Sequence, residues 1–270
     1  MSEVPTLPVP APGHALQPAG LPPAALVEIA ALALRLDRAN GPVIRALNAV
    51  GGHIEARMAA LPAGVRGAVE KGTGELLERA YMAAGFVGSL PMLPDTGNWG
   101  HRVAAATGGA VGGFGGLASA LVELPATIGL FFSAMQKVAG EYGFDPKAEE
   151  TRLACLSVFG SGGPLDDDDG VNTSFLGARL SLNGTTLTTL IQRVAPSLAA
   201  VLGRKLASQT VPVLGAVAGA GVNVAYLGYY RDMAHVRFGL MRLAESHPEE
   251  AVLAEFRAAV RNCRGAADPG

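Results

Sequence analysis

The segment from Thr210 to Glu245 constrains the fold of this chain more than any other part of it. Its first half is almost entirely small and apolar, and its second half keeps a helical spacing but adds charged and titratable residues: Arg231, Asp232, His235, Arg237 and Arg242. Apolar residues recur here three and four positions apart, without the alternation of a strand, which predicts a helix. The segment therefore begins like a membrane helix and ends like an amphipathic one.

Composition excludes several classes of protein. Only 16% of the 270 residues are charged and the mean hydropathy is +0.30, whereas charged residues approach a quarter of an ordinary soluble domain. With a formal net charge of −2 and no basic stripe to release counterions, we expect no nucleic-acid partner. The two cysteines, Cys155 and Cys263, are too few for a disulfide scaffold and indicate a reducing compartment. We expect a cytoplasmic protein, with peripheral contact to the inner face of a membrane compatible with this composition.

Helical periodicity and capping residues predict one all-α domain, a single multi-helix bundle over residues 21–264. A disordered Pro/Ala-rich arm is expected at residues 1–20 and a flexible tail at residues 265–270. Prolines and glycines mark the expected ends of the helices. These helices are expected at about residues 26–40, 43–61, 65–86, 99–123, 126–141, 147–159, 172–182, 187–195, 196–209, 210–245 and 248–263.

Two glycine ladders are expected on the central helices of the bundle. Gly108, Gly112 and Gly116 fall four apart, as do Gly215 and Gly219, and such rows let two helix backbones approach closely. Each glycine costs about 1 kcal/mol relative to alanine in a helix, so close packing or lipid must offset that cost. We favour two packed central helices over bilayer-inserted segments, although residues 103–122 have roughly the ~20-residue length of a membrane span.

No recognisable catalytic or metal-binding motif is present. The five histidines lack ligand spacing such as HExxH, so neither a metal nor a cofactor is expected. The Asp166–Asp169 run lacks the alternating ligands of an EF-hand and indicates a solvated acidic loop. There is also no nucleophile elbow, and Cys155 lies in an apolar run typical of a buried, inert thiol.

One polar set is left as a candidate site. Arg231 and Asp232 precede His235 by four and three residues, so both are its neighbours on a helix. If the glycine ladders pack together, Glu123 also approaches His235. In a catalytic interpretation His235 is a general base, Glu123 orients it or acts as an acid, and Arg231 or Arg152 stabilises developing charge. The alternative, which we favour, is a structural ion-pair network that clamps the bundle.

Several sequence blocks resemble the EcsC family. They include ELPAT at residues 123–127, YGFD at residues 142–145, CLSVFG at residues 155–160 and DMAH at residues 232–235. The resemblance implies an α-helical protein, often encoded near an ABC exporter in bacteria, without an established biochemical activity. It places Glu123, Arg152, Arg179, Asn223 and His235 at motif positions. Ahead of Arg179 the family tends to have a Tyr-Tyr pair, where this chain has Ser174-Phe175, so a role for that phenol is not expected here.

Two functions compete on these observations, and whether the protein is an enzyme stays open. The first is a membrane-associated accessory protein that acts by binding a lipid or a membrane protein such as an ABC-exporter component. Its expected binding residues are Arg152, Arg179, Asn223, Asp232 and Arg242. The second is a hydrolase that acts on an apolar substrate with Glu123, His235 and Arg231.

Overall fold

The described part of the chain is entirely helical in its regular structure, as predicted. The computed structural model describes residues 20–39, 71–82, 116–159, 186–208 and 212–265, and within these ranges no residue lies in a strand. Residues 71–82 form a helix. The other helices are α1 (Pro23–Ala39), α5 (Gly116–Glu141), α6 (Glu149–Phe159), α8 (Leu187–Ser208), α9 (Pro212–Ala244) and α10 (Glu249–Gly265). The all-α prediction is therefore confirmed.

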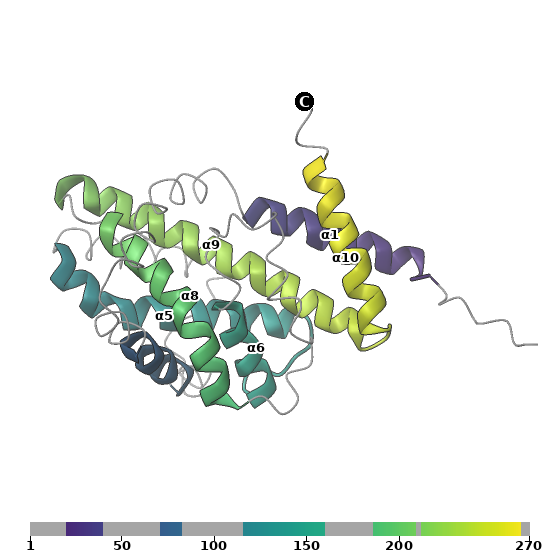
Figure 1. The fold of residues 1–270 in the computed structure, drawn as a ribbon, viewed down its shortest axis with the longest axis horizontal. Coiled ribbons are helices and arrows are strands. Elements are labelled where there is room, and N and C mark those ends of the chain that lie inside the picture. Colours follow the sequence, from purple (N-terminus) through teal and green to yellow (C-terminus); the bar gives the residue numbers. More distant parts are fainter. Residues whose placement is uncertain (1–19, 40–70, 83–115, 160–185, 209–211, 266–270) are drawn as a thin grey trace, which may run out of the picture.

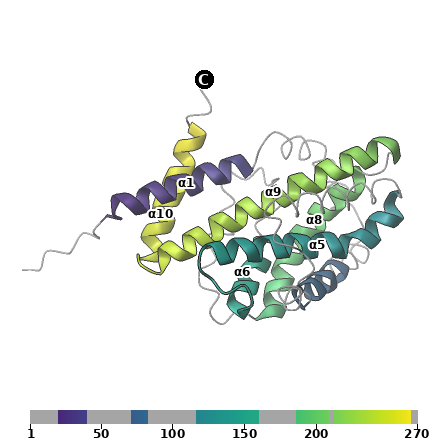
Figure 2. The same ribbon diagram turned by 180° about the vertical axis from the view of Figure 1, so that it is seen from behind.

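Helix α9 is the central helix of the structure. It contacts α1, α5, α6, α8 and α10 and runs through the length of the molecule in Figures 1 and 2. Helix α5 lies beside α9. Two ring contacts show that the helices run in the same direction: Phe131 packs on Tyr230. Farther along both segments, Phe144 packs on Phe238. Helices α1 and α10 pack on each other and on α9, at the end where α9 finishes (Figure 1). The single segment predicted for residues 210–245 thus forms one continuous helix.

Two predicted helix breaks are wrong. Helix α5 continues through Pro125 and α8 continues through Pro196. A proline inside a helix removes one backbone hydrogen bond and costs roughly 3 kcal/mol. In α8 the buried Leu190, Val194 and Leu198 continue one face across the proline. Packing of that face offsets the local cost of the proline. Predicting a helix break at every proline takes no account of this packing.

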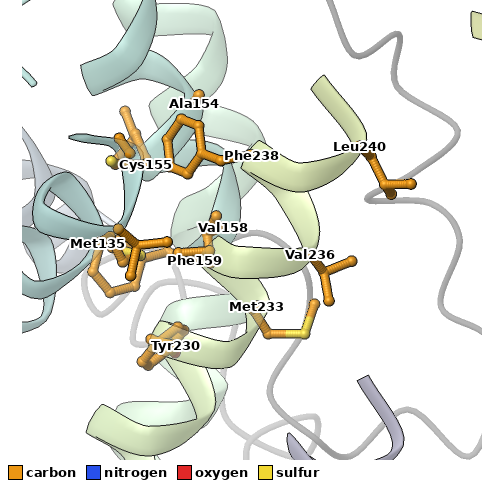
Figure 3. Close-up of a cluster of buried hydrophobic side chains, with 14 of the residues drawn as sticks. Met135, Ala154, Cys155, Val158, Phe159, Tyr230, Met233, Val236, Phe238 and Leu240 are labelled. Carbon is orange, nitrogen blue, oxygen red and sulfur yellow. The ribbon is translucent and has the colours of Figure 1, made fainter. Parts of the chain in front are cut away.

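The core lies between α5, α6 and α9. Figure 3 shows Met135 of α5, Cys155 and Phe159 of α6, and Tyr230 and Phe238 of α9 gathered in one cluster. Burial raises the pKa of the Cys155 thiol well above its usual range, which keeps it protonated and unreactive. This core fixes the second half of α9 against the end of α5.

Part of the sequence interpretation lies outside the described residues. Gly108, Gly112 and the Asp166–Asp169 run are not described, and of the side chains beside Gly116, Gly215 and Gly219 nothing is described either, so the packing of the two glycine ladders stays a prediction. None of the helices that the structure describes combines the length and apolar character needed to cross a bilayer.

Candidate functional site at the junction of α1, α5 and α9

His235 is the centre of a polar cluster inside the apolar bundle. Its side chain is 8% exposed, and its Nδ1 lies 3.4 Å from the hydroxyl oxygen of Tyr142. The two rings meet edge to face with centroids 5.7 Å apart. On the other side of the imidazole, Nε2 lies 3.8 Å from a carboxylate oxygen of Glu141. One residue on α9 therefore faces two consecutive residues at the end of α5.

The turn after α5 explains why Glu141 and Tyr142 meet α9. Gly143 has a φ of 85°, a left-handed conformation that glycine adopts without steric cost and that commonly ends helices. The Phe144 amide donates to the Ala139 carbonyl at 3.1 Å, which closes the turn. The Phe144 ring then packs on Phe238 of α9, with ring centroids 5.4 Å apart. The C-terminal end of α5 is thus held both by its own backbone turn and by the packing of Phe144 on α9.

Helix α1 borders the same cluster. Arg35 donates from Nη1 to Asp232 Oδ1 at 3.0 Å, and both side chains are about one third exposed. Arg231, one residue earlier on α9, is half-buried. Within the described ranges Arg231 has no carboxylate at ion-pair distance. The cluster therefore holds one ion pair and a second arginine beside a histidine.

Electrostatics keep the central histidine neutral. Burial, followed by the charges of Arg35 and Arg231, lowers the pKa of His235 from 6.5 to about 4. Burial also raises the pKa of Tyr142, an effect that Arg35 opposes and that Glu28 and Glu141 reinforce. At neutral pH the site thus combines a neutral imidazole with a protonated phenol. The Tyr142 hydroxyl can donate to Nδ1, which leaves the Nε2 hydrogen facing Glu141.

The remaining binding residues predicted from sequence do not join this cluster. Arg152 of α6 stacks on the Tyr81 ring, 4.0 Å from its centroid, and donates to the Tyr81 carbonyl at 3.1 Å. Asn223 is fully buried in α9, twelve residues before His235, or about 18 Å along the helix axis. Arg242 is exposed and pairs with Glu245 at 2.6 Å. These three residues occupy separate parts of the structure.

Arg179 and the side chain of Glu123 lie outside the described residues. The backbone position of Glu123 is in α5, 18 residues before Glu141, which corresponds to about 27 Å at 1.5 Å per residue. Glu141, rather than Glu123, is therefore the carboxylate that the structure brings to His235.

Sequence reasoning found the α9 half of the cluster and missed the rest. Arg231, Asp232 and His235 share a helix, so their spacing was sufficient. For Tyr142 and Glu141 the sequence signal was Gly143. A glycine after a long apolar helix indicates the end of that helix, and residues at a helix end can contact a neighbouring helix. No sequence signal pointed to Arg35 or Glu28, because their positions relative to the cluster depend on how α1 packs. Among the described residues, no group of three or more potential ligands is arranged to hold a metal ion.

The fold and the cluster define an all-α protein organised around one long central helix, with a neutral histidine between a phenol and a carboxylate. The model of the EcsC protein family matches residues 92–243. This range is more than half of the chain, so the protein belongs to the EcsC protein family. No curated protein and no solved structure matches the chain. The matched range includes Glu141, Tyr142 and His235, whereas α1 and α10 lie outside it.

Proposed function

We propose that this protein is a helical accessory protein that acts by binding, and that it docks on a membrane surface through the outward face of α1. One observation supports the proposal above the others. Leu26, Val27 and Leu34 are 40%, 71% and 54% exposed, and they are three of the four large apolar side chains exposed in the described part of the chain.

The exposed apolar residues of α1 form one stripe. Leu26, Ala30 and Leu34 are spaced four apart, with Val27 and Ala31 beside them, and all five are exposed. Residues at this spacing share a helix face. The opposite face of α1 is buried against α9 and α10. Helix α1 is therefore apolar on both sides, a pattern typical of a helix that is covered on all sides when it functions.

The size and charge of the stripe favour lipid over protein as the partner. A stable protein interface buries about 800 Å² on each side, which three partly exposed side chains on one helix do not provide. An interfacial helix needs only a few apolar side chains at the level of the headgroups. Arg38, four residues after Leu34, and Asp37 beside it have opposite charges. Apolar insertion, rather than charge, is therefore expected to dominate the docking.

Flotation with vesicles tests this proposal. The purified protein is expected to float with phosphatidylcholine vesicles and to remain bound at high salt, because the stripe is apolar. Val27→Glu and Leu34→Glu are expected to abolish flotation, and thermal unfolding should show that both variants stay folded. Met82→Glu is the matched control, since Met82 is 55% exposed and its helix lies away from α1 in both views (Figures 1 and 2).

Two results would contradict membrane docking through α1. The first is a wild-type protein that does not float, and the second is an equal loss of flotation in Met82→Glu. If protein-free vesicles fail but membranes containing an ABC exporter bind the protein in a Val27-dependent way, the partner of α1 is a membrane protein instead.

A second function, hydrolysis of an ester with an apolar acyl group, is favoured by the convergence of His235, Tyr142 and Glu141. In this mechanism Tyr142 passes its hydroxyl proton to Nδ1 of His235 and takes a proton from water, whose oxygen attacks the ester carbonyl. Arg231 stabilises the negative charge on the carbonyl oxygen. The leaving alkoxide then takes a proton from Tyr142, which regains its own proton from His235. Glu141 orients the imidazole. A histidine whose pKa is about 4 is a weak base at pH 7, which is why binding is the first proposal.

Ester turnover separates the two functions. If the protein is a hydrolase, a p-nitrophenyl ester of a medium-chain fatty acid is expected to be cleaved, with turnover reduced at least about 100-fold in His235→Gln. Flotation of the same variant is expected to be unchanged, because His235 is not on the outward face of α1. Absence of turnover, or turnover equal in wild type and His235→Gln, would reject the enzymatic function.

A further inference from the structure

We propose that α1 is a detachable cover over the cluster of His235, Tyr142 and Glu141, held closed by its buried apolar face and the Arg35–Asp232 ion pair and released when α1 moves to a lipid surface. The release step rests on the proposed membrane docking. The covering itself rests on contacts in the free protein, so the two parts can fail separately.

Helix α1 lies along the face of α9 that carries the cluster. Arg35 pairs with Asp232, and Leu32, earlier in α1, lies against Gly239, later in α9. The two helices are therefore antiparallel, and His235 falls between these two contacts. A Cβ on Gly239 would come within 2.8 Å of both terminal carbons of Leu32. Helix α1 thus approaches the α9 backbone closely beside the cluster.

Groups from three helices lie around the cluster. Helix α1 contributes Arg35 and Glu28, whose charges act on Tyr142, and Arg35 acts on His235 as well. The end of α5 contributes Glu141, and α9 contributes Arg231 and Asp232. The matched family range begins at residue 92, so α1 is packed onto the matched part from outside it. Removing α1 would leave the other groups in place and expose them to water.

A lipid surface offsets part of the energetic cost of releasing α1. The inner face of α1 consists of Ala25, Ile29, Leu32, Ala33, Leu36 and Ala39, which exchange one apolar environment for another. The surfaces of α9 and α10 that α1 covers become exposed to water, which is unfavourable. The outer stripe leaves water, which is favourable. Among the described residues, the one ion pair between α1 and the rest is Arg35–Asp232, and partly exposed pairs are weak. The cover is therefore stable in water, and an apolar surface lowers the cost of displacing it.

The rate at which diethyl pyrocarbonate modifies His235, followed by mass spectrometry, reports whether the cover is open. His247 is half-buried in the turn before α10 and serves as the internal reference. Binding to phosphatidylcholine vesicles is expected to raise the His235 rate about fivefold or more relative to His247. The nuclear magnetic resonance signals of His235 should also report a pKa that rises from about 4 toward its ordinary value.

A disulfide between α1 and α9 provides a control in which α1 cannot leave the cluster. Leu32→Cys with Gly239→Cys suits a bond between α1 and α9, because Leu32 Cγ lies 3.4 Å from the Cβ position of residue 239. Both variants carry Cys263→Ser, and Leu32→Cys alone is the control. The oxidised protein is expected to float through its outward stripe without any rise in His235 reactivity, and reduction should restore that rise.

The outcomes separate the two proposals. If the protein floats but His235 reacts no faster on vesicles, docking stands and the detachable cover is rejected. If the protein does not float, docking is rejected and the cover is judged in solution with Arg35→Glu, which opposes Asp232 with a like charge. That variant is expected to raise the His235 rate about fivefold, whereas Arg242→Glu, which breaks an exposed pair at the end of α9, should not. An unchanged rate in Arg35→Glu rejects the cover.

Discussion

Replacing Phe159 with alanine is expected to lower the free energy of unfolding by about 3–5 kcal/mol. Phe159 is fully buried at the end of α6. Its ring lies 4.9 Å from that of Tyr230 and 6.0 Å from that of Phe132, measured between centroids. It therefore joins α6 to α9 and α5 in the core of Figure 3. Truncation loses the transfer free energy of the ring and leaves a cavity that three packed helices cannot fill.

Urea unfolding monitored by circular dichroism measures this loss. Met82→Ala is the control for removal of a large apolar side chain, because Met82 is 55% exposed; it is expected to change stability by no more than about 0.5 kcal/mol. If Phe159→Ala costs less than about 1.5 kcal/mol, α6 is not locked between α5 and α9 in the way described.

Acidification from pH 7 to pH 4 is expected to remove up to about 3 kcal/mol of stability through His235 alone, at 1.36 kcal/mol per pKa unit. The pKa of His235 is about 4 in the folded protein, against an ordinary value of 6.5. Between these values the unfolded chain binds a proton that the folded protein does not. The stabilisation is therefore complete above pH 6.5, declines as the pH falls toward 4, and changes no further below that.

The comparison that isolates this effect is His235→Gln, which does not titrate. The stability difference between wild type and variant, measured by urea unfolding at several pH values, is expected to shrink as the pH falls from 6.5 to 4. Carboxylates elsewhere contribute equally to both proteins and cancel in this difference. A difference that stays constant over this range would show that His235 titrates normally in the folded protein.

Most of the described helices followed from local rules that packing did not override. The predicted start of the helix after Asp145 is confirmed within two residues, and the Asp145 carboxylate accepts from the Lys147 amide at 2.9 Å, as an N-cap does. The breaks at Pro125 and Pro196 were wrong because their local cost is offset by contacts that are distant in sequence. A periodicity that continues across a proline was the stronger signal.

The candidate site was predictable only within one helix. Arg231, Asp232 and His235 are neighbours on any α-helix, so no knowledge of packing was needed. Tyr142 and Glu141 meet His235 because α5 and α9 are parallel in one particular register, and a single sequence does not reveal that register. The sequence prediction paired Glu123 with His235. In this register the backbone of Glu123 lies about five turns before Glu141 in α5, and Glu141 faces His235 instead.

The parallel arrangement of α5 and α9 has an electrostatic consequence for any ligand of this junction. Each α-helix carries a macrodipole whose C-terminal end has about half a negative elementary charge. Helix α5 ends at Glu141, so its negative pole adds to the carboxylate directly beside His235. Arg35 and Arg231 then serve as counter-charges to the end of a helix. A small molecule that reaches this junction therefore meets a negative helix end and two arginines side by side, rather than a field of one sign.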